Sequence, residues 1–505
     1  MLNKVQEKEL RRGVYILLAL EQYCLNGDAY VWKDEVYSIC KKENPKLSFA
    51  EFSEDYAYLL RENLLCLEGR RVYLRDTLRY ENSAAENLSK IIKTNTLKSP
   101  NVPDVVVVGT TPLCNEQLEA VRMALSHRLS IVLGGAGTGK STLIRAIAQH
   151  NGDVLGSVLC APTGKAARNL TERTGMIART VHSALGVIPD ADFLAPVHWD
   201  SVSLVVVDEA SMMSLGMLAG ILDRVRYNCH VVLLGDPNQL LSVGSGNVLP
   251  DLLALGIPHI RLEENHRQEK GAEALLSNVV GFSNLRNGSD LTFDDSFCLC
   301  HMSESSARQA LIDEAVRRYS AGELVQVLSP YNTATELSVA KLNQAIRERL
   351  NPDVPGKKCL KGRFRDGDKV IITNNDRDRN CSNGDIGVLR IISDNEKKPL
   401  FYVEIPDGRR PSWDHIMDLQ NIALAYALTV HKSQGSEWDT VLMALTDSFN
   451  NMMYRNLIYT AVSRARRKVI LYGSKAALST AIQRPSRERR SQLVTKCRVA
   501  SRASA

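Results

Sequence analysis

A glycine-rich turn between a short apolar run and a helical segment constrains this chain more than any other feature. The stretch IVLGGAGTGKSTLI carries Gly134, Gly137 and Gly139. These glycines permit backbone conformations that are closed to residues with a Cβ atom, so successive N–H groups can point inward and cradle phosphate oxygens. With Lys140 and Ser141 directly after Gly139, the spacing is that of a complete phosphate-binding loop.

The residues after the loop indicate what it binds. Lys140 is placed to reach the β and γ phosphates of a nucleotide, and Ser141 to put its hydroxyl on Mg²⁺, while the helix N-terminus adds its positive dipole end. The β run before the loop and the helix after it disfavour a chance glycine turn. The loop alone does not separate a kinase, a GTPase switch, a transporter ATPase and a motor.

Net charge gives no argument for a nucleic-acid partner. The chain carries +6, but residues 483–505 alone hold seven Lys and Arg against one Glu, so the rest is neutral. A binding surface for nucleic acid therefore has to be a local patch.

Cysteine usage and hydropathy indicate a cytoplasmic, soluble protein with no membrane partner. The eleven cysteines are scattered, without a Cys-x-x-Cys pair or a zinc-like cluster, which favours buried free thiols in a reducing compartment. Cys298 and Cys300 alternate as two residues on one face of a strand do. The first residues are charged, and no run reaches the roughly 18 apolar residues of a membrane span.

Residues 1–100 predict a mainly helical domain with one short hairpin. In LLRENLLCLEGRRVYLRDTL, the turn residues Glu68, Gly69 and Arg70 separate two strand-like runs. We interpret this as a winged-helix module, with a helical packing domain that contacts only the rest of the protein as the open alternative. A polar stretch with two prolines near residue 100 predicts a linker.

From residue 104 to about 290, strand, turn and helix patterns alternate. The apolar runs in SIVLGG, DVLGSVLCAP, SLVVVDEAS and HVVLLGDP suit strands buried on both faces of a parallel sheet. Charged or polar residues stand at the carboxyl ends of most of these runs, where open α/β sheets bind ligands.

Two of these strand ends supply candidate catalytic residues. After LVVV, Asp208 is placed to hold Mg²⁺ and Glu209 to orient the water that attacks the γ phosphate. After VVLLG, Asp236 and Gln239 lie where an amide can contact the γ phosphate, although Asp-Pro-Asn is also ordinary turn chemistry. Adjacent carboxylates favour hydrolysis over transfer to a small acceptor.

Nine short segments, counting the glycine loop, follow one another in a fixed order between about residues 110 and 475. They are NEQLEAV, the glycine loop together with APTGKAARNL, ARTVHSALG, VVVDEASMM, GDPNQLLSVGSG, LEENHRQ, ALTVHKSQGSEWDTV and YTAVSRARRKVIL. Beside the loop, the others resemble the Q motif and motifs Ia, Ib, II, III, IV, V and VI of superfamily 1 helicases, in particular the RecD-like, 1B branch. The resemblance implies an α/β fold with two RecA-like motor domains and ATP with Mg²⁺ between them.

The resemblance also assigns roles to residues. For catalysis it implicates Lys140, Glu209, Gln239, Arg267 and Arg464, the two arginines stabilising charge on the γ phosphate from across a cleft. Around ATP it places Gln117, Gly134, Gly137, Thr138, Gly139, Lys140, Ser141, Thr142, Gln434, Gly435 and Glu437, with Ser141 and Asp208 on the metal. Along the nucleic-acid backbone it places Thr163, Lys165, Thr180, His182, His431, Lys432 and Ser433. Such groups bind phosphates without reading sequence.

The expected domains follow the same order. They are an N-terminal domain at 1–100, motor domain 1A at 104–290 with a short 1B hairpin near 186–200, motor domain 2A at 291–363 and 414–482, an SH3-like 2B insertion at 364–413, and a basic tail at 483–505.

Three features leave alternatives open. The 1B hairpin is short, so its action as a strand-separating pin is undecided. The barrel arginines Arg377, Arg379, Arg409 and Arg410 either grip DNA or form an ordinary charge-balanced surface. The basic tail resembles the arginine-containing C-terminal segment of these enzymes but is also consistent with a flexible terminus.

Together these features predict an ATP-dependent helicase that moves 5′ to 3′ on single-stranded DNA and acts at single-strand/duplex junctions, the polarity resting on the resemblance alone. A DNA-stimulated ATPase that acts as a sensing subunit beside a nuclease or another repair or defence subunit is the main alternative. A binding protein with a degenerate motor is a weaker one, because Lys140, Glu209, Arg267 and Arg464 are all present.

Overall fold

The computed structural model describes most of the chain. It covers residues 13–503 except 98–101, 136, 154, 188–195, 242–243, 265–270, 287, 334, 377, 396, 447–448 and 450–451. Three sequence predictions therefore concern residues outside the described part: the role of Arg267, that of Arg377, and most of the short 1B hairpin.

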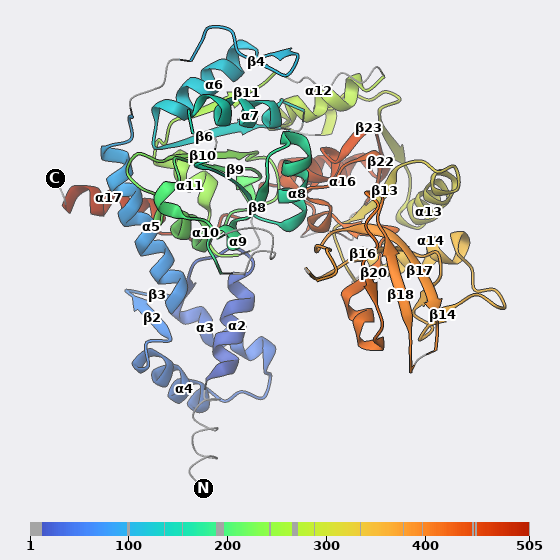
Figure 1. The fold of residues 1–505 in the computed structure, drawn as a ribbon. Helices are drawn as coiled ribbons and strands as arrows, with labels where there is room; N and C mark the ends of the chain where they lie inside the picture. Colours follow the sequence, from blue (N-terminus) through green and yellow to red (C-terminus); the bar gives the residue numbers. More distant parts are fainter. Residues whose placement is uncertain are drawn as a thin grey trace.

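The N-terminal domain projects from the body of the molecule (Figure 1). Its elements are α2 (Val14–Cys24), β1 (Val31–Trp32), α3 (Lys33–Glu43), α4 (Phe49–Arg61), β2 (Leu65–Glu68), β3 (Arg71–Leu74) and α5 (Arg75–Lys93). The expected hairpin is present: β2 pairs antiparallel with β3, and Gly69 takes a φ of 61° in the turn. Helices followed by a hairpin are consistent with a winged-helix module, which stays an interpretation.

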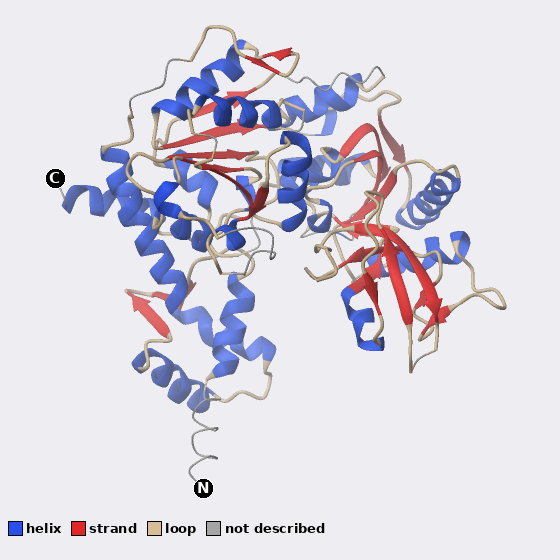
Figure 2. Ribbon diagram, in the orientation of Figure 1, coloured by secondary structure: helices blue, strands red, loops and turns tan. Residues whose placement is uncertain are grey.

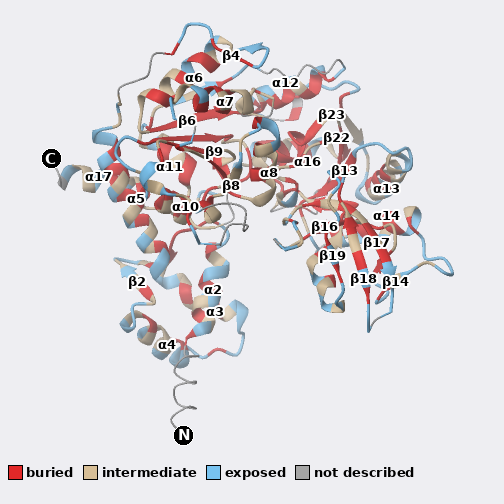
Figure 3. Cartoon of the chain, viewed as in Figure 1, coloured by how far each residue is buried: buried red, intermediate tan, exposed pale blue. Residues whose placement is uncertain are grey.

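The first motor domain, 1A, is a six-stranded sheet between helices (Figure 2). Its sheet strands are β6 (Leu129–Gly134), β7 (Ser157–Ala161), β8 (Ala178–Thr180), β9 (Leu204–Val207), β10 (His230–Gly235) and β11 (His259–Leu262), in the order β11-β6-β10-β9-β7-β8. All of these strand pairings are parallel. Every residue of β6, β9 and β10 is buried, as the apolar runs predict (Figure 3).

Helices and short segments complete this domain. They are β4 (Val107–Val108), β5 (Thr111–Pro112), α6 (Asn115–Ser126), α7 (Lys140–His150), α8 (Gly164–Thr174), α9 (Val181–Ala184), η1 (Trp199–Ser201), η2 (Ala210–Met212), α10 (Leu215–Leu222) and α11 (Val248–Ala254). The next helix, α12 (Glu273–Gly281), lies within the range predicted for 1A but buries its apolar side chains in the core of 2A, so 1A ends before it. Because α7 and α8 directly follow parallel strands, their N-termini lie at the carboxyl edge of the sheet.

The second motor domain, 2A, repeats the parallel design with five strands. These are β12 (Phe297–His301), β13 (Val325–Ser329), β21 (Ala427–Thr429), β22 (Trp438–Leu445) and β23 (Ala465–Gly473), in the order β12-β23-β22-β13-β21. Its other elements are η3 (Phe282–Asn284), η4 (Gly288–Asp290), α13 (Glu304–Ser320), α14 (Val339–Leu350), η6 (His431–Ser433), α15 (Arg455–Val462) and α16 (Lys475–Gln483). Cys298 and Cys300 alternate along β12, as their spacing indicates.

A small antiparallel β domain is inserted between α14 and β21. It contains β14 (Cys359–Leu360), β15 (Phe364–Arg365), β16 (Lys369–Ile372), β17 (Ile386–Ser393), β18 (Leu400–Glu404), β19 (Ser412–Trp413), η5 (Ile416–Asn421) and β20 (Ile422–Leu424). The sheet order β19-β18-β17-β16-β20 extends the domain beyond the predicted end at residue 413, because β20 pairs with β16. The domain also starts before the predicted residue 364, because β14 pairs with β15 and Leu360 lies in the same core. Its core is separate and includes Phe401 and Trp413, whose rings stack.

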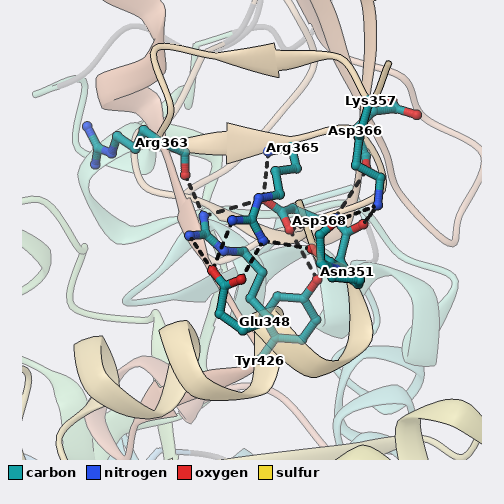
Figure 4. A network of polar contacts seen from close by, with 10 residues as sticks. Glu348, Asn351, Lys357, Arg363, Arg365, Asp366, Asp368 and Tyr426 are labelled. Atoms are coloured by element: carbon teal, nitrogen blue, oxygen red, sulfur yellow. Dashed lines mark hydrogen bonds and ion pairs between the residues drawn. The ribbon is translucent and has the colours of Figure 1, made fainter. Parts of the chain in front are cut away.

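A buried polar network attaches this β domain to 2A (Figure 4). Arg365 donates to both carboxylate oxygens of Glu348 on α14, at 2.9 and 3.1 Å. Asp368, which is fully buried, accepts from Asn351 at 2.8 Å and from the hydroxyl of Tyr426 at 3.3 Å. These contacts hold the inserted sheet against α14 in a defined orientation.

The C-terminal residues are not a flexible terminus in this structure. After α16 the chain runs back to 1A and the N-terminal domain and forms α17 (Leu493–Ala503), which packs on α5 and α11 (Figure 1). Leu493 and Cys497 are fully buried there. Within the described part of the chain, no helix is both long and apolar enough to span a membrane.

Candidate active site

The glycine loop connects β6 to α7 as a compact cradle. Gly137 and Gly139 have φ values of 87° and 76°, a region that favours glycine. Gly134 is required for a different reason, because a Cβ atom there would lie 2.6 Å from Oγ1 of Thr138. The Nζ of Lys140 donates to the carbonyl oxygens of Gly134 at 2.6 Å and Gly135 at 3.3 Å, so the ammonium lies within the loop.

Ser141 and Thr142 lie in the first turn of α7, next to Lys140. The N–H groups of this turn have no partner within the helix, and the helix dipole places partial positive charge there. The first turn of α7 therefore offers N–H donors and partial positive charge beside the ammonium of Lys140, and the predicted roles of the two hydroxyls stay predictions.

Gln117 is built into the base of this cradle. Its side-chain oxygen accepts from the backbone N–H of Cys114 at 3.2 Å, and its amide nitrogen donates to the carbonyl of Thr138 at 3.3 Å. The residue is buried, so the amide ties the start of α6 to the glycine loop. Its predicted contact with ATP stays a prediction.

The two carboxylates after β9 differ in environment. Asp208 accepts from the backbone N–H of Glu209 at 2.9 Å. Burial raises the pKa of Asp208, the charge of Glu209 raises it further, and the charge of Lys140 opposes both. Glu209 takes a φ of 53°, a left-handed conformation that non-glycine residues rarely adopt and that concentrates at functional sites.

The loop after β10 joins the two motor domains. Tyr459, on α15 of 2A, donates its hydroxyl to Oδ2 of Asp236 at 2.5 Å. The amide of Asn456 donates to the carbonyls of Pro237 and Gln239, and Thr460 accepts from the N–H of Leu240 at 2.9 Å. This loop is therefore held by one face of α15.

A cavity of about 420 Å³ lies beside the glycine loop and is lined from both motor domains. Gly134, Gly135, Thr138 and Asp236 come from the 1A side, and Tyr459 from 2A. Sequence reasoning missed Tyr459, although it opens the segment YTAVSRARRKVIL and so carried the signal of its position near Arg464. It also missed Arg261 of β11, which lines the same cavity.

Two predicted γ-phosphate sensors are buried near this junction. Gln239 is 2% exposed, and its Oε1 has no hydrogen-bond partner among the described residues. Arg464 is 4% exposed; it donates to the carbonyl of Thr460 at 3.2 Å and to the hydroxyl of Ser463 at 3.3 Å. The charge of Arg464 lowers the pKa of Tyr459, which burial and Asp236 raise, so the two side chains are neighbours.

The residues predicted to approach the nucleotide from VHKSQGSEWD divide between two places. Gln434 donates to the carbonyl of Leu240 at 3.2 Å and so lies at the loop after β10. Gly435 instead accepts from Asn169 on α8 at 2.5 Å, and Glu437 pairs with Arg173 of α8 and with Arg466. Gly435 and Glu437 are not among the described residues that line the 420 Å³ cavity, so their predicted nucleotide contacts stay predictions.

The predicted nucleic-acid residues of 1A lie at helix N-termini. Thr163 caps α8 by accepting from the N–H of Ala166, and Thr180 caps α9 by accepting from Ser183. Lys165 donates to the carbonyl of Gly384 in the β domain at 3.0 Å, and burial lowers its pKa to about 8. Burial also lowers the pKa of His182.

The matching residues of 2A form η6. Lys432 is exposed. Burial lowers the pKa of His431, and the positive charge of Arg489 lowers it further. Ser433 is fully buried and donates to the carbonyl of Val430 at 2.6 Å, so its hydroxyl faces the protein in this structure.

The barrel arginines are held by acids, which favours the surface alternative over a free DNA grip. Arg379 pairs with Asp376 at 2.6 Å, and Arg410 with Glu404 at 2.8 Å. Arg409 contacts Asp385 at 2.8 Å, which also accepts from Arg168 on α8 at 2.9 Å. Asp385 therefore links the β domain to 1A.

The donor set fits ATP with Mg²⁺. The glycine cradle leaves no room for a Cβ at Gly134, Ser141 lies at the helix end, and Asp208 is a buried carboxylate after β9, which β10 separates from β6 in the sheet. A hydroxyl and a carboxylate are hard oxygen ligands, and proteins bind Mg²⁺ through one or two such groups together with substrate phosphates.

The chain has two parallel-sheet domains, with a glycine cradle on the first and α15 of the second across the cavity. This arrangement defines a P-loop ATPase of the helicase type. Family models agree: an AAA domain matches residues 112–288, the ATP-dependent RecD-like DNA helicase SH3 domain matches 342–404, and the UvrD-like helicase C-terminal domain matches 424–472.

Sequence relatives define the family more narrowly. The chain is 32% identical over 459 residues to the ATP-dependent RecD2 DNA helicase of Deinococcus radiodurans, which covers 90% of this chain and 62% of that protein. It is 30% identical over 409 residues to the RecBCD enzyme subunit RecD of Mycolicibacterium smegmatis, which covers 73% of this chain and 72% of the relative. The chain belongs to the RecD family of helicases.

A solved structure, Bacteroides Pif1 bound to single-stranded DNA, is similar with a TM-score of 0.45 and 19% identity, over 72% of this chain and 93% of that one. This chain therefore spans less than two thirds of its RecD2 relative and nearly the whole of the Pif1 chain.

Proposed function

We propose that this chain is an ATP-dependent DNA helicase that moves 5′ to 3′ on single-stranded DNA and opens duplex at a junction. The observation that carries the proposal is the cavity beside the glycine loop, which both motor domains line and across which Tyr459 donates to Asp236. A pocket of this kind changes shape when the domains move, so hydrolysis within it is coupled to motion.

The proposed chemistry assigns each residue a task. Lys140 and the glycine-loop amides hold the phosphates, and Ser141 and Asp208 hold Mg²⁺. Bound Mg²⁺ neutralises charge on the β and γ phosphates. Glu209 positions and deprotonates the attacking water, while Arg464 and Arg267 stabilise charge on the γ phosphate.

Coupling runs through the loop after β10 and through α8. Gln239 reports the γ phosphate to α15, because the carbonyl of Gln239 already accepts from Asn456. On the opposite side of the junction, α8 contacts Gly435 and Glu437 of 2A and Asp385 of the β domain. Since Thr163 caps α8 and Lys165 lies in its first turn, a change in domain angle alters the predicted DNA contacts directly.

The proposed substrate is the backbone of single-stranded DNA. Thr163, Lys165, Thr180, His182, His431 and Lys432 are hydroxyl, ammonium and imidazole groups that bind phosphates without base readout. The D. radiodurans relative is named as a DNA helicase and the Pif1 structure holds single-stranded DNA, which supports DNA over RNA. The predicted cytoplasmic location stays a prediction.

Strand displacement tests the proposal. The full chain is mixed with a duplex that carries a 5′ single-stranded tail, with a 3′-tailed duplex and an RNA version of the 5′-tailed substrate as comparisons. We expect ATP-dependent displacement of the 5′-tailed DNA. Displacement only from the 3′ tail would contradict the polarity, and ATP turnover without stimulation by DNA would contradict the function.

A second candidate is a DNA-stimulated ATPase subunit without processive unwinding of its own. The observation that favours it is that the M. smegmatis relative is named as a subunit of the RecBCD enzyme. Such a chain would work beside a nuclease or another repair or defence subunit. Strong DNA-stimulated ATP hydrolysis without displacement from any tail would select this candidate.

A further inference from the structure

The last residues of the chain connect elements that the ATP cycle moves relative to one another. We call residues 484–503 the C-terminal strap. At its start, the carbonyl of Arg484 accepts from the N–H of Arg455 at 2.9 Å, and Ser486 donates to Asn456 at 2.5 Å, both on α15 of 2A. At its end, α17 is packed in the core that 1A shares with α5. The strap thus bridges 2A and 1A.

Between these ends, the strap is bound to the N-terminal domain by charge. Arg487 donates to Oδ2 of Asp28 at 2.5 Å, and the backbone N–H of Arg490 donates to Oδ1 of the same residue at 2.9 Å. Asp28 is 1% exposed, so its carboxylate is fully committed to the strap. Arg490 also pairs with Glu35, and this hydrogen bond lowers the pKa of Glu35.

Arg489 contacts a different partner, the far end of the loop that follows β10. Its Nη1 donates to the carbonyl of Gly246 at 2.9 Å and lies 3.4 Å from that of Gly244. The N–H of Gly246 in turn donates to the carbonyl of Gly27 in the N-terminal domain at 2.8 Å. The loop begins at Asp236 beside the phosphate cavity, so Arg489 holds one end of it and Tyr459 the other.

Arg489 packs directly against Gly27, a position whose backbone conformation favours glycine. A Cβ atom on Gly27 would lie 2.1 Å from Nε of Arg489 and 2.2 Å from its Cζ, and Gly27 also has a φ of 107°. The charge of Arg489 acts on His431, a predicted DNA contact of 2A, and on Tyr454 at the start of α15. One guanidinium therefore lies where the N-terminal domain, the loop of 1A and the DNA-side residues of 2A meet.

We propose that Arg489 is a positioning residue that fixes the loop after β10 relative to the N-terminal domain, and that it makes the N-terminal domain a working part of the motor. This inference rests on the proposed function. A guanidinium that donates to loop carbonyls from a fixed strap limits the positions that Gln239 and Asp236 can take. Small displacements of positioned groups reduce turnover strongly. The N-terminal domain enters because Gly27, Asp28 and Glu35 hold the strap.

The experiment compares DNA-stimulated ATP turnover of the full chain with that of Arg489→Ala and Arg489→Lys. We expect Arg489→Ala to reduce the ratio of stimulated to basal turnover about fivefold, with more effect on kcat than on the DNA concentration at half stimulation. Arg489→Lys restores part of the ratio because an ammonium still donates to Gly246. Arg498→Ala, on exposed α17 surface, is the matched control and leaves the ratio unchanged.

Different outcomes separate the two proposals. A parent chain without DNA stimulation overturns the proposed function and this inference with it. If DNA stimulates the parent chain and Arg489→Ala has the same ratio of stimulated to basal turnover, the inference alone is overturned. Both Arg489 variants could instead lose basal and stimulated turnover equally and have a lowered Tm. That result would assign the strap a purely structural role and would also overturn the inference.

Gly27→Ala provides an independent check through a double-mutant comparison. The added Cβ displaces the guanidinium, so Gly27→Ala alone reduces the stimulation ratio as Arg489→Ala does. If the two residues act through one contact, the double variant loses no more stimulation than the more damaged single variant. Multiplying losses would mean that they act separately and would refute the assignment of Gly27 to this contact.

Discussion

The two motor domains have sheets of the same parallel type, but 2A, in addition to His431 and Gln434 after the carboxyl end of β21, presents predicted functional residues just before the amino ends of its strands. In 1A, Gly134 ends β6, Asp208 follows β9 and Asp236 follows β10, so all three lie at the carboxyl edge. In 2A, Glu437 directly precedes β22 and Arg464 directly precedes β23.

This difference separates two kinds of work. The carboxyl edge of a parallel sheet gathers loops and helix N-termini at one place, which suits it to hold phosphates and a metal. The 2A residues reach the same junction from α15 and from the segments that lead into strands, so their distance from 1A depends on the angle between the domains. The comparison predicts that 1A substitutions abolish chemistry and that junction substitutions weaken coupling.

The largest expected effect is in 1A. Glu209→Gln should lower kcat for ATP hydrolysis by about 10² to 10⁴-fold, because a positioned general base contributes that much, while ATP binding persists. Steady-state turnover and nucleotide titration measure the two quantities. Glu119→Gln, on the exposed face of α6, is the control. Parental turnover in Glu209→Gln would remove Glu209 from the chemistry.

Tyr459→Phe tests the contact between the domains and should lower kcat about tenfold, because loss of the hydroxyl releases Asp236 from α15 and misplaced groups around the reacting phosphate reduce turnover strongly. Burial raises the pKa of Asp236, whereas Lys140 and the hydrogen bond from Tyr459 lower it. Loss of the hydroxyl therefore raises this pKa further and moves the acid limb of the pH–rate profile to higher pH. The profile of Tyr331→Phe, whose hydroxyl contacts Phe449 within 2A, should match the parent.

Asp385→Asn tests the link between the β domain and α8. Burial acts to raise the pKa of Asp385, but the hydrogen bond from Arg409 and the charge of Arg168 outweigh it, so the net pKa is lowered. A carboxylate with a lowered pKa stabilises the fold above its unfolded pKa of about 4, and this contribution is lost as pH falls through the folded pKa.

Hydrogen exchange of β16 and β17 in the full chain measures this effect. We expect Asp385→Asn to lower the local opening free energy by about 2 kcal/mol at neutral pH and to approach the parent in strong acid. Asp394→Asn, at an exposed position of the same domain, should leave exchange unchanged. Equal protection in parent and Asp385→Asn at neutral pH would mean that the link carries no stability.

The smallest expected effect concerns Lys165. Because burial lowers its pKa to about 8, its charge is present at pH 6–7 and is lost as pH rises through 8. If it contacts a phosphate, affinity for single-stranded DNA falls between pH 7 and 9, and Lys165→Met lowers the salt slope by about one at pH 7 and removes this pH dependence. Lys432→Met should keep this pH dependence. An unchanged slope in Lys165→Met would place Lys165 outside the DNA interface.

Local patterns were sufficient to predict the framework of 1A. The runs quoted for its sheet correspond to β6, β7, β9 and β10, because strands buried on both faces have to be apolar along their length. The β domain was predicted in place but ended too early, since β20 pairs with β16 only after the chain has passed through η5. A pairing partner so distant in sequence leaves no local signal.

What the sequence by itself determined is the phosphate cradle, because its glycines, Lys140 and Ser141 are neighbours in the chain and short-range sterics dictate their shape. Only the tertiary structure decided that Tyr459 meets Asp236, that Glu437 faces α8 and that the basic tail is a strap on the N-terminal domain. Those contacts join residues hundreds of positions apart. Their existence depends on how whole domains pack, which no local spacing encodes.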